Sequence, residues 1–341
     1  MTTLLEQRYR TVLRLLPASY RAEREEEMVE TYLESVPEEL HDLVRPAWGE
    51  VTSIAGLALR TRLDGTPTLP RTGLRLGPLF RQFALFGVLL NAASALSGHA
   101  LFLAWLGGAP APDQERVASS FRGSGIWDSF PVQVALWVAP LAWAGAYVAL
   151  VRDRRRAALV FAALAALPAL AGAARQLTWM PGGVATYALA TAAAALLTVA
   201  ALACGYHADA PPTPLPPVPP GLALMGLSVV AGAADVLHPG AIDALWPGGI
   251  PFLAVGALAL AGRARASAGG PAVPLALAAL GALALAERGF LLGELGRYQV
   301  PGPLITDALV LTGALAVLVA LLLATGARAL FRDRAPSRAG G

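Results

Sequence analysis

Residues 303–327 have the sequence PLITDALVLTGALAVLVALLLATGA, in which Asp307 is the one ionisable residue. An apolar run of about 18 or more residues is typical of a transmembrane helix, because about 20 helical residues cross the hydrocarbon core of a bilayer. Similar apolar runs recur upstream along most of the chain. We therefore expect about eight transmembrane helices, at 83–106, 130–151, 157–174, 184–204, 220–238, 248–262, 272–292 and 303–327.

Charge is concentrated at the N-terminal end of the chain. Of the 341 residues, 56% are hydrophobic and 14% are charged, whereas soluble domains carry about 25% charged residues. Residues 1–75 alone hold 12 of the 23 acidic residues. The sequence therefore predicts an all-α protein, in which a small cytoplasmic three-helix domain precedes a polytopic transmembrane helical bundle. The predicted parts are the helical domain (1–64), a linker (65–82), a first transmembrane half of four helices (83–204), a Pro-rich cytoplasmic linker (205–219), a second transmembrane half of four helices (220–328) and a basic cytoplasmic tail (329–341).

The N-terminal part has apolar residues at helical spacing. This spacing predicts helices over about 4–16 and 18–36, and a third helix that begins at Pro37, since proline is tolerated in the first turn of a helix. Proline inside a helix removes a backbone hydrogen bond and clashes with the preceding turn. We therefore expect Pro46 to kink or split the third helix.

Arginines predict which side of the membrane each loop occupies. Cytoplasmic loops carry an excess of Lys and Arg. With eight spans and the N-terminus inside, the cytoplasmic segments include 152–156, 263–271 and the tail, which contain Arg152, Arg154, Arg155, Arg156, Arg263, Arg265, Arg328, Arg332, Arg334 and Arg338. We therefore expect a multi-pass protein of the cell (plasma) membrane with both termini in the cytoplasm. Because the arginines lie beside apolar runs, we expect no direct binding of nucleic acid.

Similar features recur in the two predicted transmembrane halves. Asp128 and Pro131 open the second span, as Asp243 and Pro247 open the sixth. Two four-helix halves of equal orientation would be related by an axis along the membrane normal. Chance similarity between Ala-rich helices explains the same pattern, so a 4+4 repeat and chance both remain open.

Motifs of soluble enzymes are absent from the sequence. It has no GxGxxG, GxxxxGK[ST], HExxH or GxSxG pattern, which are signatures of nucleotide binding, metalloproteolysis and serine hydrolysis. A single cysteine and four histidines argue against a Cys-rich or multi-histidine metal site. We therefore expect no enzymatic activity, no catalytic residue, no cofactor and no metal.

Ionisable residues inside the predicted spans form a candidate site. A charged side chain at the bilayer centre costs about 2.5–3.5 kcal/mol, so such residues are candidates for function. One hypothesis is a polar cluster that lines a cavity and binds a ligand or relays protons. The other is a structural Asp–Arg pair, between Asp235 and Arg288, that joins helices near the outer interface. The candidate cluster comprises Asp235, His238, Glu287, Arg288 and Asp307.

The stretch LLPASYRAEREEEM at 15–28 resembles the opening of HAAS-type domains, the helix-turn-helix-associated α-helical signalling domains of actinobacterial membrane proteins. Glu25 stands where that family usually has glycine. The resemblance implies a cytoplasmic module that precedes a polytopic membrane region and is linked to PadR-type transcription regulators, although similar domains also precede some transporter permeases. The matching residues are Leu16, Pro17, Tyr20, Arg21, Glu27 and Met28.

The second predicted helix carries a candidate partner-docking face, made of Tyr20, Arg21, Glu26 and Glu27. A charged face that contacts only water is the alternative. Together with the resemblance, this face favours a non-enzymatic membrane regulator that senses an envelope state or a lipophilic ligand and signals to a cytoplasmic partner such as a PadR-type regulator. A secondary transporter or permease subunit is the alternative function. The sequence indicates neither the ligand nor the oligomeric state.

Overall fold

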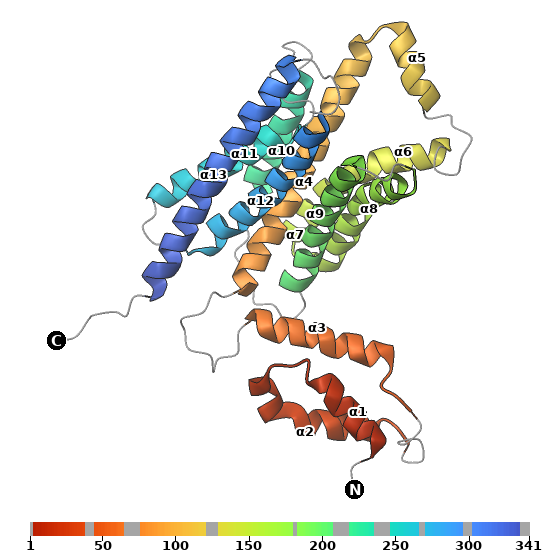
Figure 1. The fold of residues 1–341 in the computed structure, drawn as a ribbon, viewed down its shortest axis with the longest axis vertical. Helices are drawn as coiled ribbons and strands as arrows, with labels where there is room; N and C mark the ends of the chain where they lie inside the picture. The colour runs from red at the N-terminus through yellow and green to blue at the C-terminus, as the bar shows by residue number, and fades with distance from the viewer. Residues whose placement is uncertain are drawn as a thin grey trace, which may run out of the picture. The chain divides into compact units, whose positions relative to one another are not determined.

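The computed structural model describes residues 3–37, 44–64, 76–120, 129–179, 183–206, 218–234, 246–265, 270–295 and 302–334. All regular elements in these segments are helices (Figure 1). The chain divides into two compact units, Met1–Pro78 and Leu79–Gly341. The all-α class expected from the sequence is therefore confirmed for the described residues.

The first unit is a three-helix domain made of α1 (Leu4–Leu13), α2 (Ala18–Glu34) and α3 (Trp48–Asp64). The hydroxyl oxygen of Thr3 accepts a hydrogen bond of 3.3 Å from the Glu6 N–H, which satisfies one of the free donors of the first turn of α1. Residues 44–47 are not helical, and α3 begins two residues after Pro46. The split expected at this proline therefore coincides with the start of α3, while residues 38–43 lie outside the described segments.

Tyr9 joins the three helices of the first unit. Its ring on α1 stacks on the Tyr32 ring of α2, with centroids 4.0 Å apart and an angle of 7° between the planes. Its hydroxyl group donates a hydrogen bond of 3.1 Å to Oε1 of Glu50 on α3. The apolar core around it is formed by Leu13, Leu16, Val29, Ile54 and Ala58.

Among its described residues, the second unit contains six helices that are long and apolar enough to cross a membrane. They are α4 (Leu76–Gly108), the segment that combines α6 (Phe130–Val138), η2 (Ala139–Leu141) and α7 (Ala142–Val151), α8 (Arg155–Trp179), α9 (Gly183–Gly205), α12 (Ala272–Leu295) and α13 (Gly302–Arg334). Two shorter apolar helices, α10 (Val218–Ala234) and α11 (Gly249–Arg265), coincide with the expected fifth and sixth spans.

Helical structure also occupies three stretches that were expected to be a loop, the tail and the linker. The helix α5 (Ala111–Ser120) lies in a segment expected to be a loop, and α13 continues to Arg334, into the expected tail. Residues 76–82 of the expected linker are the first two turns of α4.

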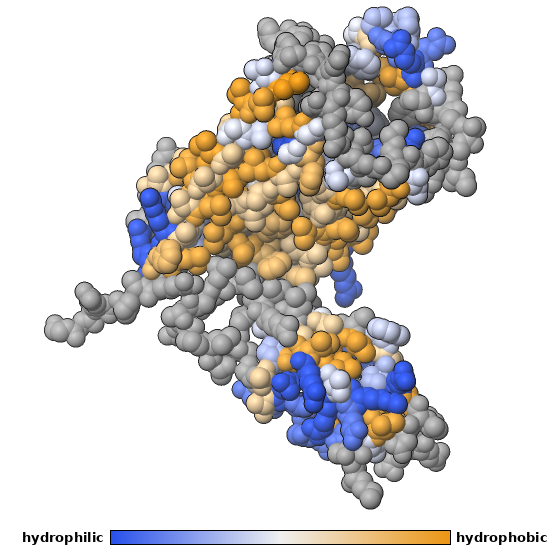
Figure 2. Space-filling view, in the orientation of Figure 1, coloured by the Kyte–Doolittle hydropathy of each residue, from blue (hydrophilic) through white to orange (hydrophobic). Residues whose placement is uncertain are grey.

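Apolar side chains form a broad region across the middle of the face of the second unit that Figure 2 draws, with hydrophilic residues at its edges. In water such a large apolar surface would favour association, whereas in a bilayer it contacts lipid. The exposed apolar residues of α13 include Leu309, Val310, Val317, Leu321 and Leu323. Together with the six long apolar helices, this surface identifies a multi-pass membrane protein.

The helix α4 contributes to both hydrophobic cores of the second unit. Its Leu85 and Val88 pack in the first core, with residues of α7, α8 and α9, whereas its Leu90 packs in the second core, with α11, α12 and α13. The helices α9 and α12 also pack against each other. The interior between the two cores is therefore bordered by α4, α9 and α12.

Pro140 interrupts the second apolar segment. It lies in the short 3₁₀ turn η2 between α6 and α7, because it has no N–H to continue the α-helical hydrogen bonds. Near this break, Nε2 of His99 on α4 lies 2.6 Å from the Trp137 carbonyl oxygen, and Nδ1 lies 2.7 Å from the Ala95 carbonyl oxygen. The histidine therefore connects α4 to α6 beside the break.

Candidate functional site

A cavity of about 490 Å³ lies inside the second unit. Its walls come from α4, η2, α7, α8, α9, α11 and α12, and from the segment 246–248 that precedes α11. Pockets that bind small molecules commonly have volumes of roughly 300–1,000 Å³ and apolar walls with a few polar groups. This cavity has that size and composition, and it is the candidate ligand site.

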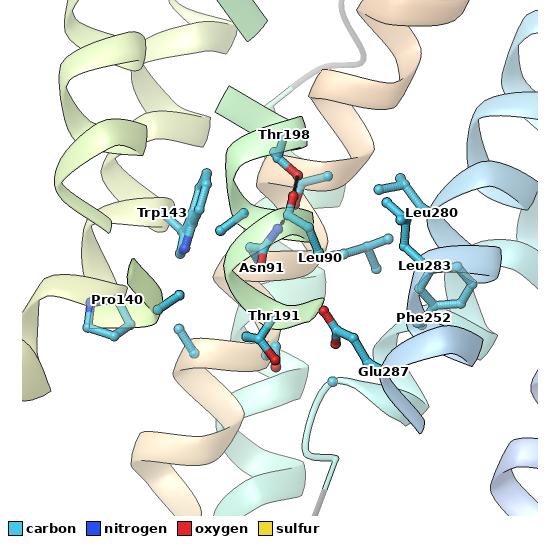
Figure 3. Close-up of a pocket in the computed structure, with 18 of the residues that line it drawn as sticks. Leu90, Asn91, Pro140, Trp143, Thr191, Thr198, Phe252, Leu280, Leu283 and Glu287 are labelled. Atoms are coloured by element: carbon cyan, nitrogen blue, oxygen red, sulfur yellow. Dashed lines mark hydrogen bonds between the residues drawn. The ribbon is translucent and has the colours of Figure 1, made fainter. Parts of the chain in front are cut away.

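Glu287 supplies the carboxyl group of the cavity. Figure 3 shows its side chain pointing from α12 into the cavity, on the side where Thr191 lies. Within the described residues, no hydrogen bond or ion pair joins this carboxyl group to another side chain. An acid without a partner inside a transmembrane unit is costly, which makes Glu287 the strongest candidate for contact with a ligand.

Neutral polar side chains also line the cavity, among them Ser94 on α4 and Tyr187 on α9. Figure 3 labels three others: Asn91 on α4, and Thr191 and Thr198 on α9. Each donates a hydrogen bond to a carbonyl oxygen of its own helix. Each of these three side chains therefore has a hydrogen-bond partner within its own helix, and it remains compatible with a membrane-spanning helix.

Aromatic and aliphatic side chains form the rest of the wall. Trp143 and Phe252 are almost fully buried, and Tyr187 and Trp246 are half-buried. In Figure 3, Leu280, Leu283 and Phe252 lie on one side of the labelled residues, and Trp143 and Pro140 on the other. The cavity therefore offers apolar contact on opposite walls.

Arg288 follows Glu287 in sequence but points elsewhere. Its side chain is only 2% exposed, and its Nη2 donates a hydrogen bond of 3.1 Å to the Ala308 carbonyl oxygen on α13. Its Nε donates a second bond of 3.3 Å to Oγ1 of Thr312. Arg288 therefore connects α12 to α13 through hydrogen bonds. It is not among the described residues that line the cavity.

The structure separates the described members of the expected polar cluster. Glu287 lines the cavity, Arg288 faces α13, and Asp307 is exposed on α13. Asp235 and His238 lie outside the described residues, so the pair of Asp235 with Arg288 stays a prediction.

Several cavity residues were not singled out from the sequence, among them Tyr187, Thr191 and Thr198. Their spacing is a usable signal, because Thr191 and Thr198 follow Tyr187 by four and eleven positions on the mostly apolar α9, which places the three residues on one helix face. The remaining cavity residues that were missed are apolar or small, and no such signal distinguishes them.

A second cavity of about 500 Å³ lies beside the first. It is lined by residues of α4, α5 and α6, including His99, Phe102, Val117 and Trp137. Ser94, Ala95 and Pro140 line both cavities.

Two of the four residues of the candidate docking face form ion pairs within the first unit, and the other two line a groove. Glu26 receives two hydrogen bonds from the Arg10 guanidinium, of 2.8 and 2.9 Å, and these bonds lower the pKa of Glu26. Nη1 of Arg21 lies 3.8 Å from Oε2 of Glu25 on the same helix. Tyr20 and Glu27 instead line a surface groove of about 370 Å³, together with Tyr9, Arg24, Met28, Thr31, Tyr32, Ser35 and Glu50.

Within the part of the chain that the structure describes, no group of three or more His, Cys, Asp or Glu residues is arranged to hold a metal ion. No protein-family model, no curated protein and no solved structure matches this chain.

Proposed function

We propose that this chain is a non-enzymatic membrane sensor, which binds a lipophilic ligand in the cavity of its second unit and signals through its N-terminal domain to a cytoplasmic partner such as a PadR-type transcription regulator. The observation that carries the proposal is the position of Glu287, a carboxyl group without a described partner on the wall of a cavity of about 490 Å³. Buried unpaired carboxyl groups are costly and mark functional sites.

The first unit supports the signalling half of the proposal. It has its own hydrophobic core and a groove lined by Tyr20 and Glu27. Both residues belong to the stretch that resembles HAAS-type domains. A domain with a separate core can present such a surface to a soluble protein while the second unit stays in the bilayer.

The signalling half is tested by affinity purification of the full-length protein from cells. The variant Tyr20→Ala/Glu27→Arg changes two residues of the groove, and Glu30→Arg on the exposed side of α2 is the matched control. We expect the wild type and the control to recover the same soluble protein, and the groove variant to lose it while still inserting into the membrane. Equal recovery by all three proteins would contradict the docking role of the groove.

For topology, we propose eight spans with both termini in the cytoplasm, counting the shorter α10 and α11 as spans. The exposed Arg152 and Arg154 between α7 and α8, and the exposed Arg156 in the first turn of α8, support a cytoplasmic loop there. Reporter fusions after Arg155 and after Arg338 should both indicate the cytoplasm. A periplasmic signal from the second fusion would overturn the eight-span topology.

A secondary transporter or permease subunit is the second candidate function. It is favoured by the location of the cavity, whose walls come from both expected transmembrane halves, as in transporters whose substrate sites lie between structural repeats. The 4+4 repeat is part of this candidate. The two functions differ in their dependence on the first unit, because a sensor signals through it and a transporter does not need it for uptake. For a transporter, we expect deletion of residues 1–63 to leave substrate uptake by cells unchanged and Glu287→Gln to impair it.

A further inference from the structure

The neutral polar side chains of the cavity offer acceptors to a ligand. The hydroxyl group of Thr191 donates its proton to the Tyr187 carbonyl oxygen, at 3.2 Å, and that of Thr198 donates to the Ala194 carbonyl oxygen, at 3.0 Å. A hydroxyl group has one proton and two lone pairs. Once the proton is engaged with the backbone, only the lone pairs remain for a molecule in the cavity.

The side chain of Asn91 follows a similar pattern. Its Nδ2 donates a hydrogen bond of 2.8 Å to the Gly87 carbonyl oxygen, so one of its two N–H groups is engaged and its Oδ1 stays an acceptor. Together with the carboxyl oxygens of Glu287, Asn91, Thr191 and Thr198 therefore offer the cavity several acceptors, alongside the hydroxyl groups of Ser94 and Tyr187. A ligand that satisfies the acceptors must bring hydrogen-bond donors.

The charge of the cavity has one sign. No Arg or His is among its described lining residues, and Glu287 is the acid among them. The adjacent Arg288 donates hydrogen bonds to Ala308 and Thr312 on α13, and its guanidinium carbon lies behind the cavity wall, 5.6 Å from the centroid of the Trp246 ring. An ionised carboxyl group in this low-dielectric interior therefore favours a cation, because a buried charge is stabilised by a partner of opposite sign.

The walls add the contacts that a lipophilic cation requires. Trp143 and Tyr187 line the cavity, and aromatic rings attract cations as well as apolar groups. The ring of Trp246, which also lines the cavity, already contacts the Arg288 guanidinium. The volume of about 490 Å³ accommodates an organic molecule of moderate size.

On the basis of the ligand-binding function proposed above, we infer that the ligand class is a lipophilic ammonium ion. Its N–H groups donate hydrogen bonds to Glu287, and to Thr191 or Asn91, while its hydrocarbon part contacts the aromatic and leucine walls. This assigns Glu287 as the residue that selects the charge of the ligand, and the apolar walls as the part that selects its size.

The test compares three probes that share one hydrocarbon cage and differ in charge: 1-adamantylammonium, 1-adamantanol and adamantane-1-carboxylate. Binding is measured by equilibrium dialysis of the full-length protein in nanodiscs of zwitterionic lipid, after subtraction of the uptake by empty nanodiscs. We expect the ammonium ion to bind most tightly and the carboxylate to show no binding above the empty nanodiscs. Glu287→Gln should weaken ammonium binding about tenfold or more, since a hydrogen bond to a charged group contributes about 1.5–3 kcal/mol.

Two matched controls locate the effect. Asp307→Asn removes an exposed carboxyl group from α13 and should leave ammonium binding unchanged. Ala284→Phe fills the cavity from α12 and should abolish binding, whereas Ala286→Phe, on the exposed side of the same helix, should preserve it.

The outcomes separate the ligand class from the proposed function. If the alcohol binds as tightly as the ammonium ion, and both are lost only in Ala284→Phe, the cavity binds lipophilic molecules but the inference of a cation is wrong. Equal ammonium binding by wild type and Glu287→Gln would also overturn the inference. If no probe binds in a way that Ala284→Phe abolishes, the ligand-binding function itself fails.

Discussion

The guanidinium carbon of Arg288 lies 5.6 Å from the centroid of the Trp246 ring, and Trp246 is itself part of the cavity wall. A cation placed over an indole ring is attracted to its π electrons. Because Arg288 also bonds to Ala308 and Thr312, it holds three segments together: α12, α13 and the chain that enters α11. The cavity wall therefore depends on a residue that does not line the cavity.

The first prediction concerns this arrangement. Arg288→Ala removes the hydrogen bonds to α13 and leaves a void, so we expect a loss of about 2 kcal/mol in the free energy of unfolding. Arg288→Lys keeps the positive charge but not the planar guanidinium group. It should lower the free energy of unfolding by less than Arg288→Ala does. Unfolding in detergent by increasing SDS, followed by circular dichroism, measures both. Arg332→Ala on the exposed end of α13 is the control, and an SDS unfolding curve of Arg288→Ala that matches the curve of this control would contradict the assignment.

The second prediction compares two glycines of α12. A Cβ atom at Gly281 would overlap the Val319 side chain of α13 and lie 3.3 Å from Cζ of Phe252, whereas a Cβ atom at Gly289 would meet no atom within 4 Å. Overpacking typically costs about 1–3 kcal/mol. We therefore expect Gly281→Ala to lower the free energy of unfolding, and Gly289→Ala to leave it unchanged or raise it. Equal effects of the two substitutions in the same SDS titration would show that α12 and α13 do not pack as described.

The third prediction concerns the end of α9. Nε of Arg81 donates a hydrogen bond of 3.0 Å to the carbonyl oxygen of Gly205, the last residue of that helix. The last carbonyl groups of a helix lack partners within the helix and favour a cation nearby. Arg81→Ala should therefore increase hydrogen exchange in the last turns of α9, measured by mass spectrometry, with Arg156→Ala as an exposed control. Unchanged exchange there would exclude a capping role for Arg81.

The fourth prediction is a pH dependence of the first unit. Burial raises the pKa of Tyr9 above its usual value, and the hydrogen bond to Glu50 and the charge of Glu50 raise it further. The folded domain therefore favours the neutral phenol. The contribution of Tyr9 to stability is complete below a pH of about 10, the unfolded pKa, and is lost as the pH rises from there toward the folded pKa.

Alkaline titration of the full-length protein at 295 nm measures this shift. The curve of the wild type minus that of Tyr9→Phe isolates the Tyr9 phenol, and its midpoint should lie above that of N-acetyltyrosinamide in the same detergent. If the midpoint for Tyr9 lies at or below the midpoint for N-acetyltyrosinamide, Tyr9 is not buried against Glu50.

The sequence predicted the helices well because long apolar runs determine both their position and their length. Each of the eight expected spans corresponds to a helix in the described residues, although α10 and α11 are shorter than the six others. The helix α5 was missed because its residues 111–120 are mostly polar or small, and nothing in them distinguishes a short surface helix from a loop.

The candidate site was only partly predictable. Glu287 was identified as an ionisable residue in a span, but its neighbour Arg288 was placed in the same cluster. A helix that is apolar on all sides carries no periodic signal that says which face is turned inward, and α12 is such a helix. Adjacent residues on a helix point about 100° apart, so Glu287 and Arg288 reach different neighbours. Only the packing of α12 against α9 and α13 decides which neighbours those are.

The break at Pro140 has a consequence for the size of molecule that the protein can hold. Pro140, Ser94 and Ala95 border both cavities, so a septum of small side chains separates volumes of about 490 and 500 Å³. Ser94 and Ala95 belong to the α-helix α4, whereas Pro140 lies in the 3₁₀ turn η2. A 3₁₀ turn is held by poorer hydrogen bonds than an α-helix, so Pro140 is on the more deformable side of this septum. Displacement of the turn would merge them into one elongated chamber, and a long hydrocarbon chain would then extend past His99 while its polar end stayed at Glu287.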